Sequence, residues 1–269
     1  MFHCLSIILD SPIERGGQQF DDLITIESIR DFILASSSTF PSVVQNTLNH
    51  QAYTMPKIIY SRPHGNSVRI FALGEDGVLA LNSVFAHLSR TKQMRIKNKN
   101  YKIKSLVVDP DKDFLAQSNG LKNTYTTLTP IAIFGKKNYG VFKSIYHRAF
   151  GDNIPVRKET IQKAEPMKKE AFYGELKQFA KQFITDYIKF YTASVLGGEK
   201  NTYAFVDTLE IEWNNIDIVF AKYHSEEKAM PMVIGKFNSN LMLPKFIGYK
   251  TGKGFGELSL KEKGAAYGF

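Results

Sequence analysis

The fold is decided by residues 57–90, which have the sequence KIIYSRPHGNSVRIFALGEDGVLALNSVFAHLSR. Two short runs rich in β-branched and aromatic residues, at 57–61 and 67–73, flank the turn-forming stretch RPHGN and predict two strands. From Glu75 to Arg90 the apolar residues recur at helical spacing, which predicts an amphipathic helix. This part of the chain is therefore expected to form a strand–strand–helix unit.

The flanking residues complete a known supersecondary pattern. Residues 3–9 have apolar side chains on one face of a predicted strand, and residues 24–36 have the spacing of a helix. Residues 94–108 predict a hairpin that turns near Asn98. The resulting order is strand, helix, strand, strand, helix, strand, which is typical of a ferredoxin-like (split βαβ) domain. We place this domain at 1–122.

The second half of the chain again mixes helices with antiparallel strands. Helices are expected at Tyr139–Phe150 and 170–196, and the charged residues 157–169 between them are expected to form a solvated loop. Strands are expected at 124–134, 202–212, 216–223, 231–238 and 257–260, the last of them after a glycine-bearing segment at 248–256. These elements predict a second α+β domain at 123–269.

The composition indicates a globular chain with a polyanionic partner. The 269 residues include 35 Lys and Arg against 26 Asp and Glu, which gives a formal net charge of +9. The chain also has 20 Phe, 13 Tyr and 1 Trp, and a basic surface with many aromatic residues suits a nucleic acid whose bases can stack. The alternative is that the charge only keeps the chain soluble. A hydrophobic content of 43% excludes wholly disordered and collagen-like chains.

Cysteine content and the N-terminus predict the compartment. Cys4 is the only cysteine, which excludes an internal disulfide and a cysteine-based zinc cluster. The first residues lack the basic region and cleavage site of a signal peptide, and no uninterrupted apolar run is long enough to span a bilayer. We therefore expect a soluble, cytoplasmic protein without a membrane partner.

The predicted hairpin at 94–108 lies in a basic, acid-free stretch. Its seven basic residues are Arg90, Lys92, Arg95, Lys97, Lys99, Lys102 and Lys104. Because alternate strand residues share a face, Arg95, Lys97 and Lys99 are expected to point one way, and Lys102 and Lys104 to do the same on the returning strand. Such a face would bind a phosphate backbone. The alternative is an edge hairpin that lysines protect from aggregation.

The glycine-bearing segment has the sequence FIGYKTGKGFG at 246–256. It is not a nucleotide P-loop, because only three residues separate Gly248 from Gly252 and a glycine follows the lysine. Glycines allow positive φ and a close approach to a ligand, and no acid occurs between Met232 and Gly256. The candidate phosphate-binding residues are Lys236, Lys245, Lys250, Lys253, Gly252, Gly254 and Gly256. The alternative is a tight turn that only packs.

The histidines limit the chemistry. No two of the six have the local spacing of a metal site, so we expect no metal and no cofactor. His50 follows the first helix in a polar connection at 45–51, close to Tyr53, and a loop histidine beside a tyrosine suits general acid–base catalysis near neutral pH. His3 on the first strand could approach His50 after folding.

The C-terminal residues KFNSNLMLPKFIG at 236–248, followed by GKGFG at 252–256, resemble the end of the CRISPR repeat-processing endoribonucleases. These form the Cas-six (Cas6) family, and the likeness is to its b-type branch. Weaker matches keep the family's chain order: Ile29-Arg30, YTMPKIIY at 53–60, Leu128-Thr129-Pro130 and Asn138-Tyr139.

The resemblance implies tandem ferredoxin-like (RRM-like) domains and metal-independent cleavage of precursor CRISPR RNA within its repeats. The substrate 2′-hydroxyl would attack the adjacent phosphate and leave 5′-hydroxyl and 2′,3′-cyclic phosphate ends. His50 would then be the general base or acid, and Tyr53 would orient it or share the proton transfer. Lys57 or Arg30 would steady the phosphate, while the hairpin and the glycine-bearing segment would hold the RNA backbone.

The chain departs from the branch at the expected catalytic position. The branch usually has Leu-x-His-x-His there, whereas this chain has His50 between Asn49 and Gln51. Two alternatives therefore stay open beside the endoribonuclease: a non-cleaving repeat-RNA-binding protein of the same fold, and an RNA-contacting scaffold subunit of a CRISPR effector complex. The expected partners are repeat RNA and precursor crRNA, with effector subunits and a homodimer left open.

Overall fold

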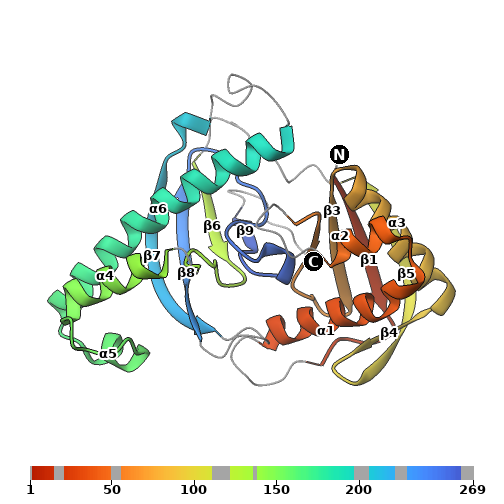
Figure 1. Ribbon diagram of the computed structural model, residues 1–269, viewed down its shortest axis with the longest axis horizontal. Coiled ribbons are helices and arrows are strands. Elements are labelled where there is room, and N and C mark those ends of the chain that lie inside the picture. The colour runs from red at the N-terminus through yellow and green to blue at the C-terminus, as the bar shows by residue number, and fades with distance from the viewer. Residues whose placement is uncertain are drawn as a thin grey trace.

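The computed structural model describes residues 2–14, 21–49, 56–110, 122–135, 138–196, 206–221 and 229–261. The chain forms two lobes, each with one sheet and its helices (Figure 1). The first lobe contains β1 (Phe2–Leu9), α1 (Asp21–Ser36), the 3₁₀ helix η1 (Ser37–Thr39), α2 (Ser42–Leu48), β2 (Ile58–Tyr60), β3 (Ser67–Leu73), α3 (Gly74–Thr91), β4 (Gln93–Ile96) and β5 (Lys99–Pro110). The second lobe contains β6 (Asn123–Thr127), α4 (Tyr139–Phe150), α5 (Lys158–Lys163), α6 (Pro166–Leu196), β7 (Ile211–Ala221), β8 (Met230–Ser239), the 3₁₀ helix η3 (Thr251–Lys253) and β9 (Leu258–Lys261).

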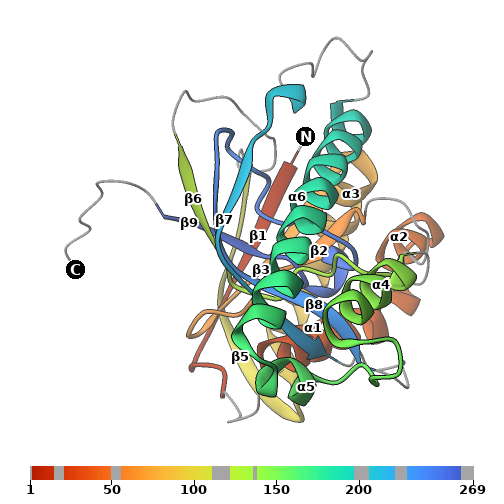
Figure 2. The same cartoon turned by 90° about the vertical axis from the view of Figure 1, so that its left-hand side faces the viewer.

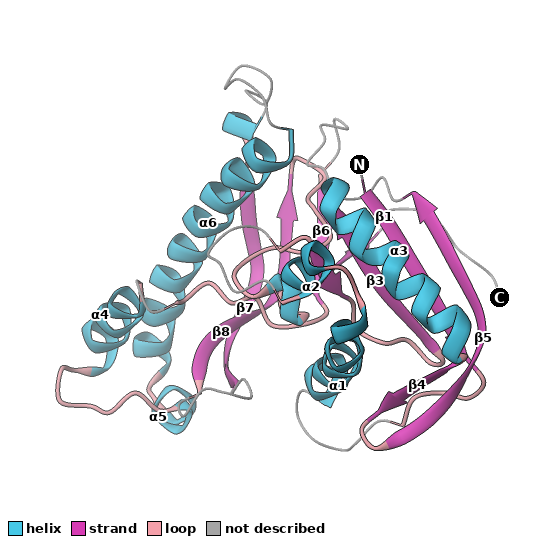
Figure 3. Cartoon of the chain, turned by 45° about the vertical axis from the view of Figure 1, so that its right-hand side comes forward, coloured by secondary structure: helices cyan, strands magenta, loops and turns pink. Residues whose placement is uncertain are grey.

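The first sheet has the strand order β2-β3-β1-β5-β4, and its neighbouring strands are antiparallel. Its first four strands have the ferredoxin-like arrangement, and β4 is an additional edge strand supplied by the hairpin. Alternation along β1 places Leu5, Ile7 and Leu9 in one core with residues of α1 and α3 such as Ile29 and Val84. Figure 3 shows these helices together on one face of the sheet.

The second sheet has the strand order β7-β8-β6-β9, which is the same arrangement with β6 as the first strand. The long helix α6 lies across this sheet (Figure 2) and buries Phe172, Leu176, Ala180, Ile184 and Ile188, which recur every four residues. The second crossover, between β8 and β9, is described throughout and holds no α-helix, only η3 within the glycine-bearing segment. The α+β class and the tandem ferredoxin-like folds are thus confirmed.

Four local expectations were wrong. The polar connection at 45–51 begins inside α2, because the apolar Val44 and Leu48 anchor a short helix in the core. The charged stretch 157–169 forms α5 and the start of α6, because Ile161 is buried and proline suits the first turn of a helix. The remaining two concern strands.

The strand expected at 124–134 ends at Thr127, three residues before Pro130, a residue that cannot donate to a ladder. The strands expected at 202–212 and 216–223 are replaced, within the described residues, by the single strand β7. Asn214 and Asn215 do not end that strand: the register with β8 shifts between Trp213 and Asn215, which is the signature of a bulge.

Within the described ranges, no helix combines the length and the apolar character needed to cross a membrane.

Candidate nucleic-acid interface

The two lobes meet along the glycine-bearing segment, which Figure 1 shows in blue between them. Phe246 at its start is 1% exposed and packs edge-to-face on Phe71 of β3, with 5.6 Å between the ring centroids. Cys4, Ile59 and Tyr191 belong to the same buried cluster. The non-helical face of the first sheet is therefore joined to the second lobe by apolar packing at this point.

The glycines of this segment are required by contacts within the protein. A Cβ at Gly252 would lie 2.8 Å from the Cβ of Pro56, and one at Gly254, whose φ is +82°, would lie 2.6 Å from Ile26. At Gly256, with φ of +76°, a Cβ would lie 1.8 Å from the carbonyl oxygen of Ile247. The close approach at these glycines is to the first lobe and to the segment itself, and their contact with RNA stays a prediction.

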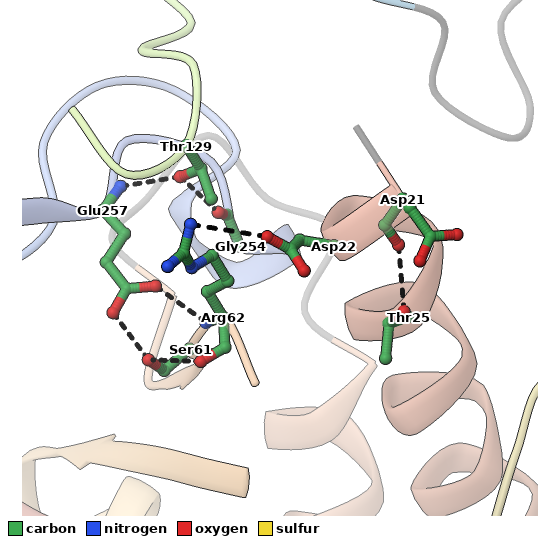
Figure 4. A network of polar contacts seen from close by, with 8 residues as sticks. All are labelled: Asp21, Asp22, Thr25, Ser61, Arg62, Thr129, Gly254 and Glu257. Carbon is green, nitrogen blue, oxygen red and sulfur yellow. Dashed lines mark hydrogen bonds and ion pairs between the residues drawn. The ribbon is translucent and has the colours of Figure 1, made fainter. Parts of the chain in front are cut away.

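A buried carboxylate links the lobes beside these glycines (Figure 4). Glu257 is 1% exposed and accepts hydrogen bonds from Ser61 Oγ, at 2.6 Å, and from the main-chain nitrogen of Arg62, at 2.7 Å. Thr129 Oγ1 accepts from the Glu257 nitrogen at 2.9 Å and donates to the Gly254 oxygen at 2.8 Å. Each of these polar groups is therefore hydrogen-bonded within the protein, as buried polar groups generally are.

The polar network continues toward the basic hairpin. The Arg62 guanidinium lies 3.5 Å from the Asp22 carboxylate on α1 (Figure 4). The neighbouring Asp21 accepts a hydrogen bond from Lys97 Nζ at 2.6 Å. Glu257 is thus connected through α1 to the turn of the hairpin, and both predicted RNA-binding regions contact the same helix.

The glycine-bearing segment is also fixed to α6. Burial raises the pKa of Tyr187, and a hydrogen bond between its hydroxyl and Thr251 opposes that shift. Lys245 Nζ lies 4.8 Å from the centre of the Phe71 ring, which is a cation–π distance. Lys245, a predicted phosphate-binding residue, therefore also has a contact within the protein. Lys250 and Lys253 are partly exposed.

The tip of the basic hairpin differs from the prediction. Lys97 and Asn98 have φ of +47° and +64°, as the two central residues of a tight hairpin turn require. Lys99 pairs with Ile96, and its Nζ lies 5.5 Å from the centre of the Tyr101 ring. The expected shared face of Arg95, Lys97 and Lys99 is therefore wrong, because Lys97 belongs to the turn and not to a strand.

Two hairpin lysines also form ion pairs with acids outside the hairpin. Lys97 pairs with Asp21, and Lys99 Nζ lies 2.5 Å from the Glu14 carboxylate. In contrast, Lys102 and Lys104 are exposed and have no ion pair with a described residue. Tyr101, which precedes Lys102 on the same strand, is buried, as expected from alternation. The basic residues in and beside the hairpin that are exposed and have no ion pair with a described residue are Arg90, Lys92, Arg95, Lys102 and Lys104.

The two principal catalytic candidates, His50 and Tyr53, lie outside the described residues. Lys57 is described: its side chain is about half exposed and pairs with Asp76 in the first turn of α3. Asp76 was not among the sequence candidates, because nothing in its local sequence marks it as a partner of Lys57.

Arg30 and His3 lie on the first lobe. Arg30 is mostly buried, with a side chain 20% exposed, and it opposes the rise in the pKa of Tyr60 that burial causes. His3 is on β1, where its Nδ1 atom is buried and has no hydrogen-bond partner in the part of the chain that the structure describes. Ser61 and Glu257 were missed by sequence reasoning, because 196 positions separate them and neither stands in a recognisable pattern.

No protein-family model matches the chain, and no curated protein matches it. Solved structures do match over nearly its whole length. A structure described as "Crystal structure of Cas6b" has a TM-score of 0.59 and 17% identity, and covers 96% of this chain and 99% of its own. A second, "Crystal structure of CRISPR RNA processing endoribonuclease Cas6b", has a TM-score of 0.53 and 15% identity, with 97% and 99% covered.

A third structure, "An RAMP protein binding different RNA substrates", has a TM-score of 0.52 and 14% identity, and covers 97% of this chain and 100% of its own. All three span both lobes. At this level of identity the comparison shows the fold alone. The chain has the fold of the Cas6b structures.

Proposed function

We propose that the chain is a Cas6-type endoribonuclease that binds CRISPR repeat RNA and cleaves precursor CRISPR RNA. The observation that carries the proposal is the likeness to the Cas6b structures over 96–97% of this chain. The net charge of +9 and the exposed basic residues of the hairpin support a polyanionic partner. The C-terminal sequence resemblance points independently to the same family.

The proposed chemistry needs no metal. A general base takes the proton of the substrate 2′-hydroxyl, the 2′-oxygen bonds to phosphorus, and the bond from phosphorus to the 5′-oxygen breaks as an acid protonates the leaving oxygen. His50 is the proposed base or acid, and Tyr53 orients it or shares the transfer. Lys57 would stabilise the charge that develops on the phosphate oxygens. The Asp76 carboxylate, which already pairs with the Lys57 ammonium, would compete with the phosphate for it.

The proposed RNA contacts divide into two regions. The exposed basic residues of the hairpin would bind phosphates, with Lys102 and Lys104 lacking any acid partner among the described residues. The lysines of the glycine-bearing segment would bind phosphates nearer the junction of the lobes. The RNA would then cross the same helix α1 that the polar network joins to both regions.

The deciding experiment is incubation of the protein with its own repeat RNA in EDTA. Wild type should give 5′-hydroxyl and 2′,3′-cyclic phosphate ends, and His50→Ala should lose cleavage while it keeps binding. His64→Ala is the matched control, because His64 is exposed in the β2–β3 turn and has no proposed role. Undiminished cleavage by His50→Ala would contradict the assignment.

The second candidate is a repeat-RNA-binding protein that does not cleave. The observation that favours it is the single histidine, His50, where the b-type branch usually has two. In this case wild type would bind the repeat with a strong salt dependence and leave the RNA intact in EDTA. The same incubation therefore separates the two functions.

A further inference from the structure

Tyr249, in the glycine-bearing segment, presents an exposed aromatic ring next to the junction of the lobes. Its side chain is 45% exposed, and its ring packs edge-to-face on Phe183 of α6, with 5.0 Å between centroids and 70° between planes. Among the Phe, Tyr and Trp side chains described, only Phe190 is comparably exposed. The Tyr249 ring is thus supported by an aromatic contact within the protein, while nearly half of the residue is open to solvent.

The support behind Tyr249 is a continuous series of rings along α6. Phe183 stacks on Tyr187 at 6.3 Å, and Tyr187 stacks on the fully buried Tyr191 at 6.1 Å. The series therefore runs from the core to the surface and ends at Tyr249. A ring held by such neighbours loses little conformational freedom when a flat ligand packs on it.

The backbone at Tyr249 is also fixed. Its nitrogen donates to the carbonyl oxygen of Ala132 at 2.9 Å. The residues on either side, Gly248 and Lys250, have φ of +99° and +60°. At Gly248 a Cβ would lie 2.8 Å from Ile131, so the chain packs closely against residues 131 and 132 just before Tyr249. Tyr249 is thus preorganised.

The lysines of the segment that contains Tyr249 favour a negatively charged ligand. The residues from 232 to 256 contain four lysines and no acid, and Lys250 is the next residue. An exposed, supported ring within a basic segment fits a base whose phosphates are held nearby, since stacking on aromatic rings is the common mode of single-strand recognition. We infer that Tyr249 is a stacking platform for one unpaired base of the bound RNA. This inference rests on the proposed function.

The first test compares binding of the repeat RNA by wild type, Tyr249→Ala and Tyr249→Phe over a range of salt concentrations. Tyr249→Ala should weaken binding about 5- to 150-fold, the range expected for one stacked base. Its slope of log affinity against log salt should be unchanged, because no phosphate contact is removed. Tyr249→Phe should bind as wild type does. Phe190→Ala is the control, since Phe190 lies outside the acid-free segment.

The second test places a single abasic nucleotide at each position of the repeat in turn. At one position the abasic RNA should bind wild type and Tyr249→Ala equally, because the stacking partner is gone from both complexes. Loss of affinity by Tyr249→Ala without any such position would overturn the base assignment and indicate a contact to sugar or protein. Wild-type affinity in Tyr249→Ala would overturn the stacking alone, whereas a wild-type chain that fails to bind the repeat would overturn the proposed function as well.

Discussion

The Glu257 carboxylate accepts a hydrogen bond from Ser61 Oγ at 2.6 Å, across the junction of the two lobes. A second bond from the Arg62 nitrogen occupies the other carboxylate oxygen. Both donors are uncharged groups, and the carboxylate is buried, so these two hydrogen bonds replace the contacts with water that the carboxylate loses on burial. The lobes are therefore joined by this buried polar contact in addition to the packing of Phe246 on Phe71.

Replacing Glu257 by alanine should destabilise the protein. The substitution removes the acceptor of the Arg62 nitrogen and leaves the Ser61 hydroxyl only its 3.5 Å contact with the Arg62 oxygen, which costs about 2–4 kcal/mol of unfolding free energy. Urea unfolding measures the loss. Glu212→Ala is the control: Glu212 is exposed and pairs with Lys122, so its removal should leave the midpoint unchanged. Equal midpoints for both variants would contradict a structural role for Glu257.

The elements that were predicted well are those with a local cause. The helix expected at Glu75–Arg90 is found at Gly74–Thr91, because its apolar spacing depends only on neighbouring residues. The pairing of Glu257 with Ser61 has no local signal, since each residue is ordinary in its own surroundings. Lys97 was misplaced because alternation was extended through a turn, where positive φ ends the strand period.

Lys102 and Lys104 should each contribute to RNA binding through charge. Replacing either by alanine should weaken binding and reduce the slope of log affinity against log salt by about 0.7 to 1. Lys189→Ala is the matched control, because this exposed lysine already pairs with Asp207 on the second lobe. If the Lys189 variant changes the slope as much as the hairpin variants do, the hairpin is not a specific RNA-binding surface.

Tyr60→Phe should stabilise the protein. The Tyr60 hydroxyl is buried and has no hydrogen-bond partner among the described residues, so its removal should raise the unfolding free energy by about 1 kcal/mol at pH 7. Burial raises the pKa of Tyr60, which means that the unfolded chain loses this proton at lower pH than the folded chain does. The contribution of the protonated Tyr60 to the unfolding free energy is therefore fully present below the ordinary tyrosine pKa, and it decreases as the pH rises above that value.

The same substitution, Tyr60→Phe, tests how the unfolding free energy depends on pH in the alkaline range. Above about pH 10 one such tyrosine lowers stability by about 1.4 kcal/mol for each pH unit, and Tyr60→Phe should remove that share of the slope. Unfolding curves between about pH 9 and about pH 11, which span about one unit on either side of the ordinary tyrosine pKa, measure it. Parallel declines in wild type and Tyr60→Phe would show that Tyr60 titrates alike in both states.

Lys57 and Asp76 form an ion pair whose two members should differ in importance for cleavage. If Lys57 stabilises the phosphate in the transition state, Lys57→Ala should lower the cleavage rate by about 10- to 1000-fold with little change in repeat binding. Asp76→Ala should not lower that rate, because it leaves the ammonium in place and removes its competitor for the phosphate. An ion pair that only supports the start of α3 predicts the opposite pattern, in which both variants lose the same amount of stability and of activity. Single-turnover cleavage in EDTA, measured beside thermal unfolding of each variant, therefore decides whether Lys57 acts on the RNA or on the fold.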